Sequence, residues 1–192
     1  MADTERLTDQ EGIYLLSMAR KTIEKRLFNQ KDDDQGDPDL SPRYSERRGT
    51  FVTLTINEGL RGCIGHIIPG ESLIEGIRVN AINAAFRDPR FSPLSKEEWG
   101  DVKVEISILT EPKGLPYLDA DDLLNKLRPG IDGVIIKKGF RQATFLPQVW
   151  EQLPDKKDFL THLCMKAGLD GHAWKKERLE VSLYQAQAFE EH

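Results

Sequence analysis

GTFVTLTINEGLRGCIGHI, residues 49–67, carries the clearest structural pattern in the chain. Its first half alternates apolar Val52, Leu54 and Ile56 with polar threonines, which is the period-two pattern of a half-buried strand. Asn-Glu-Gly at 57–59 has the composition of a tight turn, and a second extended run follows at once. The sequence therefore predicts a β-hairpin over residues 49–67.

Helical patterns lie on both sides of this hairpin. Thr8 and Glu11 have the spacing of a capping box, and apolar residues then recur every four positions, which predicts a helix over 8–29. A second apolar stripe predicts a helix over 71–87, ended by the two prolines of DPRFSP. The acidic segment between the first helix and the hairpin, residues 30–47, is expected to be an exposed connection.

Two further strands complete the fold prediction. Residues 102–110 alternate apolar and polar side chains, and residues 179–188 are predicted to form a last strand. Short turns between successive strands favour antiparallel pairing. We therefore expect an α+β protein: a mainly antiparallel sheet built from the hairpin and both strands, with the two helices packed on it.

The composition excludes several classes of protein. The chain has 192 residues, of which 39% are hydrophobic, and a net charge of −5, which suits a globular domain and argues against nucleic-acid binding. No apolar run reaches the roughly 20 residues that a membrane helix needs. The start, MADTERLTDQ, lacks the basic and apolar parts of a secretory signal, so a cytoplasmic location is expected.

The two cysteines, Cys63 and Cys164, are expected to act as separate thiols. They form no CxxC pair and no zinc-ligand spacing, so we expect no disulfide, no structural metal and no cofactor. Cys164 lies in the apolar run FLTHLCMKAGL and is expected in the core. His162, two residues earlier, would point about 200° away from it on a helix, so the two are not expected to share a metal.

LRGCIG, residues 60–65, contains the candidate nucleophile. On a regular strand Arg61, Cys63 and Gly65 share one face. A guanidinium beside a thiol stabilises the thiolate, which is the reactive form, and Gly65 would leave open space for a ligand next to the sulfur. The backbone amides near Gly62 and Gly65 would stabilise developing negative charge. The alternative is that Cys63 is a small buried apolar residue.

Other polar residues are weaker candidates. His66 lies an odd number of positions from Cys63, so a Cys63–His66 pair would need a bulge at Gly65. Glu105 is a candidate general acid or base, or else a solvated strand residue. Asn80 and Asn83 border the apolar face of the second helix, where they would line a binding site or make ordinary hydrogen bonds. Asp88 and Arg90 flank a proline in DPR, residues 88–90, and are expected to pair within their loop.

The motifs GTFVTL, LRGCIGHI, NAINAAFRDPRF, VEISILT and ATFLPQVWEQLP, in this order, closely resemble the AMMECR domain family. The resemblance spans roughly residues 10 to 190 and implies a single domain over 8–190, after a tail of residues 1–7. It also implies a larger and a smaller subdomain, with LRGCIG at a cleft between them. In many microbes such a protein is encoded with a Memo-like protein and a radical SAM protein, which are therefore candidate partners.

Two functions follow from the sequence. The first is an enzyme, in which Cys63 reacts, Arg61 holds it as thiolate or binds an anionic substrate, and Glu105 transfers protons. The second is a non-catalytic domain that binds a small ligand or works as an adapter with the Memo-like and radical SAM partners. A second titratable group within reach of Cys63 would favour the enzyme.

Overall fold

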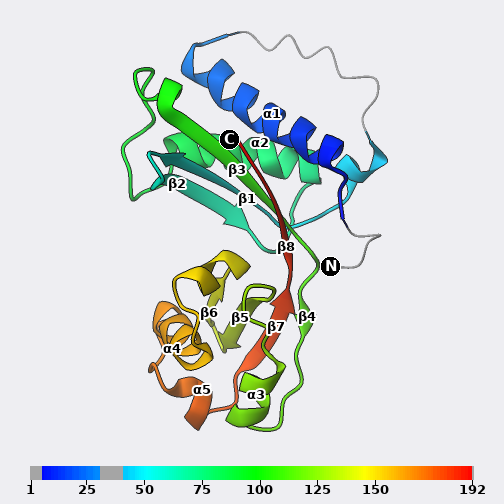
Figure 1. The fold of residues 1–192 in the computed structure, drawn as a ribbon, viewed down its shortest axis with the longest axis vertical. Helices are drawn as coiled ribbons and strands as arrows, with labels where there is room; N and C mark the ends of the chain where they lie inside the picture. Colours follow the sequence, from blue (N-terminus) through cyan, green and yellow to red (C-terminus); the bar gives the residue numbers. More distant parts are fainter. Residues whose placement is uncertain (1–5, 31–40, 192) are drawn as a thin grey trace. The chain divides into compact units, whose positions relative to one another are not determined.

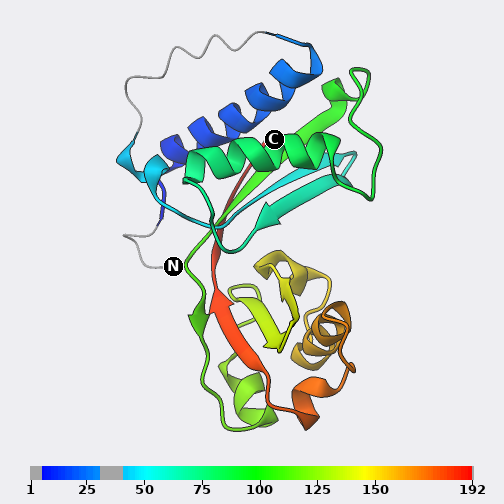
Figure 2. The ribbon, with the colours of Figure 1, turned by 180° about the vertical axis from the view of Figure 1, so that it is seen from behind.

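The computed structural model describes residues 6–30 and 41–191, and they form two compact units (Figures 1 and 2). The first unit holds the chain up to Leu109 together with the residues from Gln187 onward. The second unit is the continuous segment Thr110–Ala186. Each unit has its own sheet and its own apolar core.

The first unit is a four-stranded sheet in the order β2-β1-β3-β8, with two helices on one face. The strands are β1 (Thr50–Ile56), β2 (Gly59–His66), β3 (Val102–Leu109) and β8 (Ala186–Glu190). Figures 1 and 2 show helices α1 (Asp9–Leu27) and α2 (Leu73–Phe86) together on the same side of this sheet. β1 pairs antiparallel with both β2 and β3, as predicted.

The hairpin forms because its turn and its register fit the sequence. Asn57 and Glu58 have φ of 50° and 63°, the left-handed values of a type I′ turn, whose twist matches that of the strands. The register shifts between Leu54 and Thr55, which pair with Gly62 and Leu60, so Arg61 is an extra residue at a β-bulge. The bulge lies at Arg61 and not at Gly65, which pairs regularly with Phe51.

The core of the first unit lies between the sheet and the two helices. Buried side chains come from one face of the strands and from the apolar stripes of α1 and α2; they include Leu15, Ala19, Ile23, Val52, Leu54, Ile77, Ala81, Val104 and Ile106. Helix α1 begins at the predicted capping box, because Thr8 accepts from the Glu11 N–H and Glu11 accepts from the Thr8 N–H.

The second unit has a sheet in the order β4-β7-β5-β6. Its strands are β4 (Lys113–Gly114), β5 (Gly133–Lys138), β6 (Arg141–Phe145) and β7 (Glu180–Tyr184), and its helices are α3 (Ala120–Lys126), α4 (Lys156–Lys166) and α5 (Ala173–Lys176). In its core the rings of Trp150 and Phe159 stack with centroids 3.6 Å apart.

The structure corrects the prediction for residues 179–188. This segment is not one strand of one sheet: its first part is β7 of the second sheet, and its last part belongs to β8 of the first. The hairpin, the strand over 102–110 and the two long helices are confirmed within one or two residues of their expected ends.

The described parts of the two segments expected to be exposed contain buried residues and a short helix. Residues 1–5 of the expected tail and 31–40 of the expected connection lie outside the described residues. Leu7 is buried, and its N–H donates to Gln187 Oε1 at 2.9 Å. A short 3₁₀ helix, Pro42–Ser45, places Tyr44 against Tyr14 in a stacked pair of rings.

Candidate functional site

A thiol, a hydroxyl and a carboxylate lie in one row across three strands of the first sheet. Thr53 of β1 is paired with Cys63 of β2 and with Glu105 of β3, and directly paired residues project from the same face. The neighbours Val52 and Leu54 are buried in the core under the helices, so the Cys63–Thr53–Glu105 row lies on the opposite face from α1 and α2.

The members of the row are linked by weak or indirect contacts. Thr53 Oγ1 lies 3.4 Å from Cys63 Sγ, within the range of a sulfur hydrogen bond. The buried Ser107, two residues along β3, donates to Glu105 Oε1 at 3.2 Å. Neighbouring strands are about 4.8 Å apart, so the backbones of β2 and β3 at Cys63 and Glu105 lie about 10 Å apart, with β1 between them. Proton transfer between Cys63 and Glu105 would therefore need an intervening water molecule.

The loop after α2 holds the backbone of Cys63. The Cys63 N–H donates to Asp88 Oδ2 at 2.9 Å, and Arg90 Nη2 donates to the Cys63 carbonyl at 3.0 Å. Arg90 and Asp88 also form an ion pair of 2.6 Å, as the sequence predicted. Because β2 is an edge strand, these side chains satisfy backbone groups that would otherwise be open to another strand.

Charge at this loop is set by the same contacts. Hydrogen bonds from Arg90, with those from the backbone of Cys63 and Arg90, hold the pKa of the buried Asp88 carboxyl well below its usual range against the opposing effect of burial. The pKa of Arg90 is raised, first by its hydrogen bond to Asp88 and also by its attraction to Cys63. Arg90 therefore places a cation beside Cys63, whose backbone carbonyl it binds.

Arg61 takes a different partner from the one expected. Its guanidinium binds both oxygens of Glu98, at 2.6 Å and 3.0 Å, and donates to the Ser92 carbonyl at 3.0 Å. Hydrogen bonds from Arg61, followed by the N–H of Ser95, lower the pKa of Glu98 to about 2. The bulge removes Arg61 from the regular alternation, and Arg90, not Arg61, contacts Cys63, by donating to its carbonyl.

The two glycines of LRGCIG are explained by close packing. A Cβ on Gly62 would lie 2.2 Å from the Ala84 carbonyl oxygen of α2. A Cβ on Gly65 would lie 2.3 Å from the Phe51 ring and from the Thr50 carbonyl oxygen. The expected open space at Gly65 is therefore wrong, because Phe51 fills it, and both positions accept only glycine without a shift of the backbone or ring.

His66 and Asn80 form a polar cluster on the helix-facing side of the sheet. Asn80 is buried and donates to the Thr50 carbonyl and hydroxyl at 3.2 Å and 2.9 Å. His66 Nδ1 lies 3.3 Å from the Asn80 amide, and His66 Nε2 lies 3.5 Å from Glu71. Even strand positions face the helices, so His66 and Cys63 point to opposite faces and do not form a pair.

The remaining sequence candidates lie apart from the row. Asn83 accepts from Arg87, one turn along α2, at 3.4 Å. Cys164 is fully buried on α4, and burial raises the pKa of its thiol, while His162 is exposed. Within residues 6–30 and 41–191 no group of three His, Cys, Asp or Glu is placed to hold a metal ion. No helix in this part of the chain is long and apolar enough to cross a membrane.

Thr53 and Glu98 are residues of this region that sequence reasoning missed. In the sequence Thr53 is one of the polar residues of an alternating strand pattern, and its pairing with both Cys63 and Glu105 follows only from the strand order. Glu98 is 37 residues from Arg61 in the chain, and no local pattern connects them.

The fold and the row define an α+β protein with a cysteine, a threonine and a glutamate on one face of its first sheet. The AMMECR1 family model matches residues 16–189, and the chain belongs to this family. A relative from Methanosarcina barkeri is 44% identical over 188 residues, covering 96% of this chain and 92% of the relative. Another, from Methanopyrus kandleri, is 39% identical over 191 residues, covering 97% and 91%.

A solved structure has the same fold. The crystal structure of an uncharacterised protein from Pyrococcus horikoshii aligns with a TM-score of 0.88 at 35% identity, over 97% of this chain and 94% of that one. The α+β arrangement with two antiparallel sheets is therefore shared along nearly the whole length of both chains.

Proposed function

We propose that this protein is an enzyme in which Cys63 attacks an electrophilic carbon of a small substrate. The observation that carries the proposal is the Cys63–Thr53–Glu105 row, which combines a thiol with a titratable carboxylate on one sheet face. A nucleophilic cysteine needs a group that accepts its proton, directly or through water, and we assign that role to Glu105, which lies across Thr53 from Cys63.

Each residue has a defined part in the reaction. Glu105 accepts the thiol proton through a water above Thr53, and the sulfur forms a bond to the electrophilic carbon. The bond from that carbon to its leaving group then breaks, and Glu105 returns the proton to the leaving group. Attack by a water molecule releases the product and restores the thiol, so that atoms and charge balance. Arg90, whose guanidinium donates to the Cys63 carbonyl, supplies a cation beside the attacking sulfur.

Asp88 acts as a positioning residue in this proposal. Its carboxylate holds both the Cys63 N–H and the Arg90 guanidinium, so it fixes the strand and the cation relative to each other. Arg61 has a structural part, because its Nε and Nη2 donate to Glu98 and Ser92 near the start of β2. The roles of the backbone amides near Gly62 and Gly65 stay predictions.

The experiment uses an activated ester, p-nitrophenyl acetate, as a general acyl donor. We expect the wild-type protein to release p-nitrophenol and to carry an acetyl group on Cys63 by peptide mass mapping. Cys63→Ser should abolish this acylation, and Glu105→Gln should slow it at least tenfold with the fold intact. Cys164→Ser is the matched control and should react like wild type.

Two results would reject the proposal. One is acylation that persists in Cys63→Ser, and the other is an unchanged rate in Glu105→Gln measured on a correctly folded variant. A circular dichroism spectrum equal to that of wild type shows that each variant is folded.

A non-catalytic adapter role is the second candidate, and one observation favours it. The polar groups of the row contact one another or Ser107, and Asp88 and Arg90 engage the Cys63 backbone, so the face is stable without a substrate. Under this reading Cys63→Ser and Glu105→Gln weaken binding to a purified Memo-like or radical SAM partner, measured by calorimetry, while no acylation occurs.

A further inference from the structure

Strand β2 is an edge of the first sheet, and its outward-facing backbone is closed at Cys63 and open at Gly65. The Cys63 N–H and carbonyl point away from β1, since they bind Asp88 and Arg90. Residues of an antiparallel strand alternate between facing the partner strand and facing away from it. Gly65 is two residues further on and pairs regularly with Phe51, so its N–H and carbonyl point to the same open side as those of Cys63.

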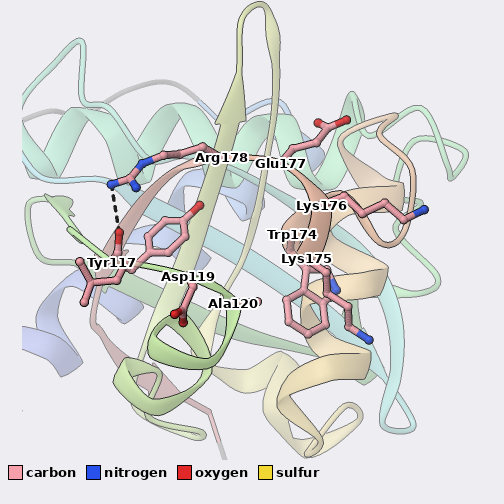
Figure 3. Close-up of a pocket in the computed structure, with 9 residues that line it drawn as sticks. Tyr117, Asp119, Ala120, Trp174, Lys175, Lys176, Glu177 and Arg178 are labelled. Atoms are coloured by element: carbon pink, nitrogen blue, oxygen red, sulfur yellow. Dashed lines mark hydrogen bonds between the residues drawn. The ribbon is translucent and has the colours of Figure 1, made fainter.

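Other strand edges of the molecule are closed by cationic side chains. In the second unit, Arg178 Nη2 donates to the Tyr117 carbonyl at 3.0 Å, just beyond the edge strand β4, as the dashed line in Figure 3 shows. Lys166 Nζ donates to the Thr144 carbonyl of β6 at 2.9 Å. Charged side chains commonly protect edge strands from pairing with other chains. In the part of the chain that the structure describes, neither outward group of Gly65 has such a partner, and Gly65 is partly exposed.

The Phe51 ring lies against Gly65 on the sheet face that carries Cys63. A Cβ on Gly65 would fall 2.3 Å from this ring, so the ring occupies the place of a side chain. Phe51 is only partly buried, which leaves an apolar surface beside the open edge. Directly paired residues project from the same face, so a residue that paired with Gly65 would place its side chain next to the Phe51 ring.

We propose that the substrate of this protein is a short extended peptide, one residue of which pairs antiparallel with Gly65 and carries an apolar side chain against Phe51. An extended residue presents one N–H and one carbonyl on the same side, which matches the two outward groups of Gly65. Asp88 and Arg90 end this pairing at Cys63, so the peptide leaves the edge beside the thiol. The assignment of a substrate rests on the function proposed for Cys63, whereas the pairing with Gly65 does not.

The reaction is then the cleavage of an amide bond in this peptide. The Cys63 sulfur bonds to the carbonyl carbon, the carbon–nitrogen bond breaks, and Glu105 passes the thiol proton to the leaving amine. Water then hydrolyses the thioester to a carboxylic acid and restores the thiol. The only co-reactant is water.

The pairing is tested by NMR on the full-length Cys63→Ser variant, which lacks the nucleophile. The probe is acetyl-Gly-Leu-Gly-methylamide. We expect a saturable shift of the Gly65 amide signal, while the signal of the Ile64 amide, which faces β1, moves less. The same peptide with N-methyl-leucine lacks the N–H that pairs with the Gly65 carbonyl and should bind at least tenfold more weakly.

The apolar contact is tested with a second peptide and a matched pair of variants. Acetyl-Gly-Gly-Gly-methylamide should bind more weakly than the leucine peptide, and Phe51→Ala should remove this preference. Phe140→Ala is the control, because Phe140 is a fully exposed aromatic side chain of the second unit; it should leave the preference unchanged. The N-methyl comparison decides the pairing even if Phe51→Ala does not fold.

The reaction is tested on the wild-type protein with acetyl-Gly-Leu chloromethyl ketone, in which the Cys63 sulfur displaces chloride. We expect saturable labelling of Cys63, located by peptide mass mapping, at least tenfold faster than with the same concentration of chloroacetone.

Each outcome has a distinct meaning. The absence of a saturable Gly65 shift, or equal binding of the N-methyl peptide, would overturn the inference. A saturable shift without faster labelling of Cys63 would reject the peptide as the substrate. If p-nitrophenyl acetate fails to acylate Cys63 while the Gly65 shift is saturable, the function proposed for Cys63 fails and the peptide site stands.

Discussion

Asp88 is the carboxylate that joins the helix-following loop to the edge strand. It accepts hydrogen bonds from the Cys63 N–H and from Arg90, and its side chain is only 1% exposed. Replacing it removes several charge-assisted hydrogen bonds at once and leaves the Cys63 N–H without its partner. The stability of the first unit and the geometry of Cys63 therefore depend on the same side chain.

We expect Asp88→Asn to lower the free energy of unfolding by about 2 kcal/mol at pH 7. Because the pKa of Asp88 is lower in the folded than in the unfolded chain, the carboxylate stabilises the fold above its unfolded pKa, and this contribution is lost as the pH falls from about 4. Urea unfolding of both proteins at pH 7 and at pH 3 measures the effect. The difference between them should shrink at pH 3, and a difference independent of pH would contradict the assignment.

The pH dependence has a second source at Glu98. Its folded pKa of about 2 also lies below its ordinary value, so the stability that it contributes is present above about pH 4.5 and is lost on acidification toward pH 2. Asp101 is an exposed carboxylate directly before β3. Asp101→Asn is the control in the urea measurements and should change the free energy of unfolding by less than about 0.5 kcal/mol.

The two cysteines should differ in reactivity. Cys63 is partly exposed, whereas Cys164 is fully buried and its thiol has a raised pKa because of burial. Iodoacetamide at neutral pH should therefore modify Cys63 well before Cys164, as peptide mass mapping over time will show. If Cys164 reacts first, or if Cys63 reacts only after unfolding, Cys63 is structural and the enzyme proposal loses its support.

At the residue scale, contacts within a short stretch of chain could be predicted from the sequence, whereas contacts between distant segments could not. The pairing of Asp88 with Arg90 is local and was expected from DPR. The alternation rule placed Arg61 beside Cys63, and a single extra residue at the bulge defeats that rule. The contacts of Cys63 with Thr53 and with the loop join distant parts of the chain, which periodicity does not describe.

Strand β2 and helix α2 are packed so closely that a side chain is excluded between them. The Cβ that alanine would add at Gly62 falls 2.2 Å from the Ala84 carbonyl oxygen, and both partners are backbone. Close approach of backbone explains why a strand contains a residue that disfavours strands.

Gly62→Ala should therefore lower the free energy of unfolding by about 3 kcal/mol, since helix and strand must separate. Gly70→Ala is the matched control, because a Cβ at Gly70 meets nothing within 4 Å; it should change stability by less than about 0.5 kcal/mol. Urea unfolding followed by circular dichroism compares the two. Equal stabilities of the two variants would show that the helix moves away at little cost.

At the element scale, the predictions succeeded where each sequence pattern corresponds to a single helix or strand. The capping box of α1 and the alternation of β1 and β3 are local signals, and these elements are confirmed. The segment 179–188 failed because its pattern runs on without a break: β7 ends at Tyr184 and β8 begins at Ala186, with only Gln185 between them. No glycine or proline marks the change of sheet.

The two units differ in how the chain forms them. The second unit is a continuous segment, whereas the first needs residues from both sides of it. Each has its own buried cluster of apolar side chains, so each has the core that independent folding requires. Thr110 and Gln185, at the two ends of the second unit, are hydrogen-bonded to each other through Thr110 N and Gln185 O at 2.9 Å.

Residues 110–186 expressed alone should fold. The stacked Trp150 and Phe159 rings should give a near-ultraviolet circular dichroism signal that is lost cooperatively in urea. In the complementary design, residues 111–184 are replaced by Asn-Gly, which joins Thr110 to Gln185 through a two-residue turn. The first unit should also fold in this shortened chain. A fragment 110–186 without cooperative unfolding would show that its core is insufficient alone.

Strand β8 reaches its sheet late in protein synthesis. A ribosome makes all of Thr110–Ala186 before it completes β8, so the second unit is complete in sequence while the first still lacks a strand. Until β8 is made, β3 is an open edge of the sheet. The backbone N–H and carbonyl of Val104 then lack their hydrogen bonds to Glu191, and Arg20 lacks its ion pair of 2.5 Å with the Glu191 carboxylate. Nascent chains of this protein thus expose a strand edge during translation that the finished molecule covers, and a chaperone acting on it would bind before Glu191 emerges.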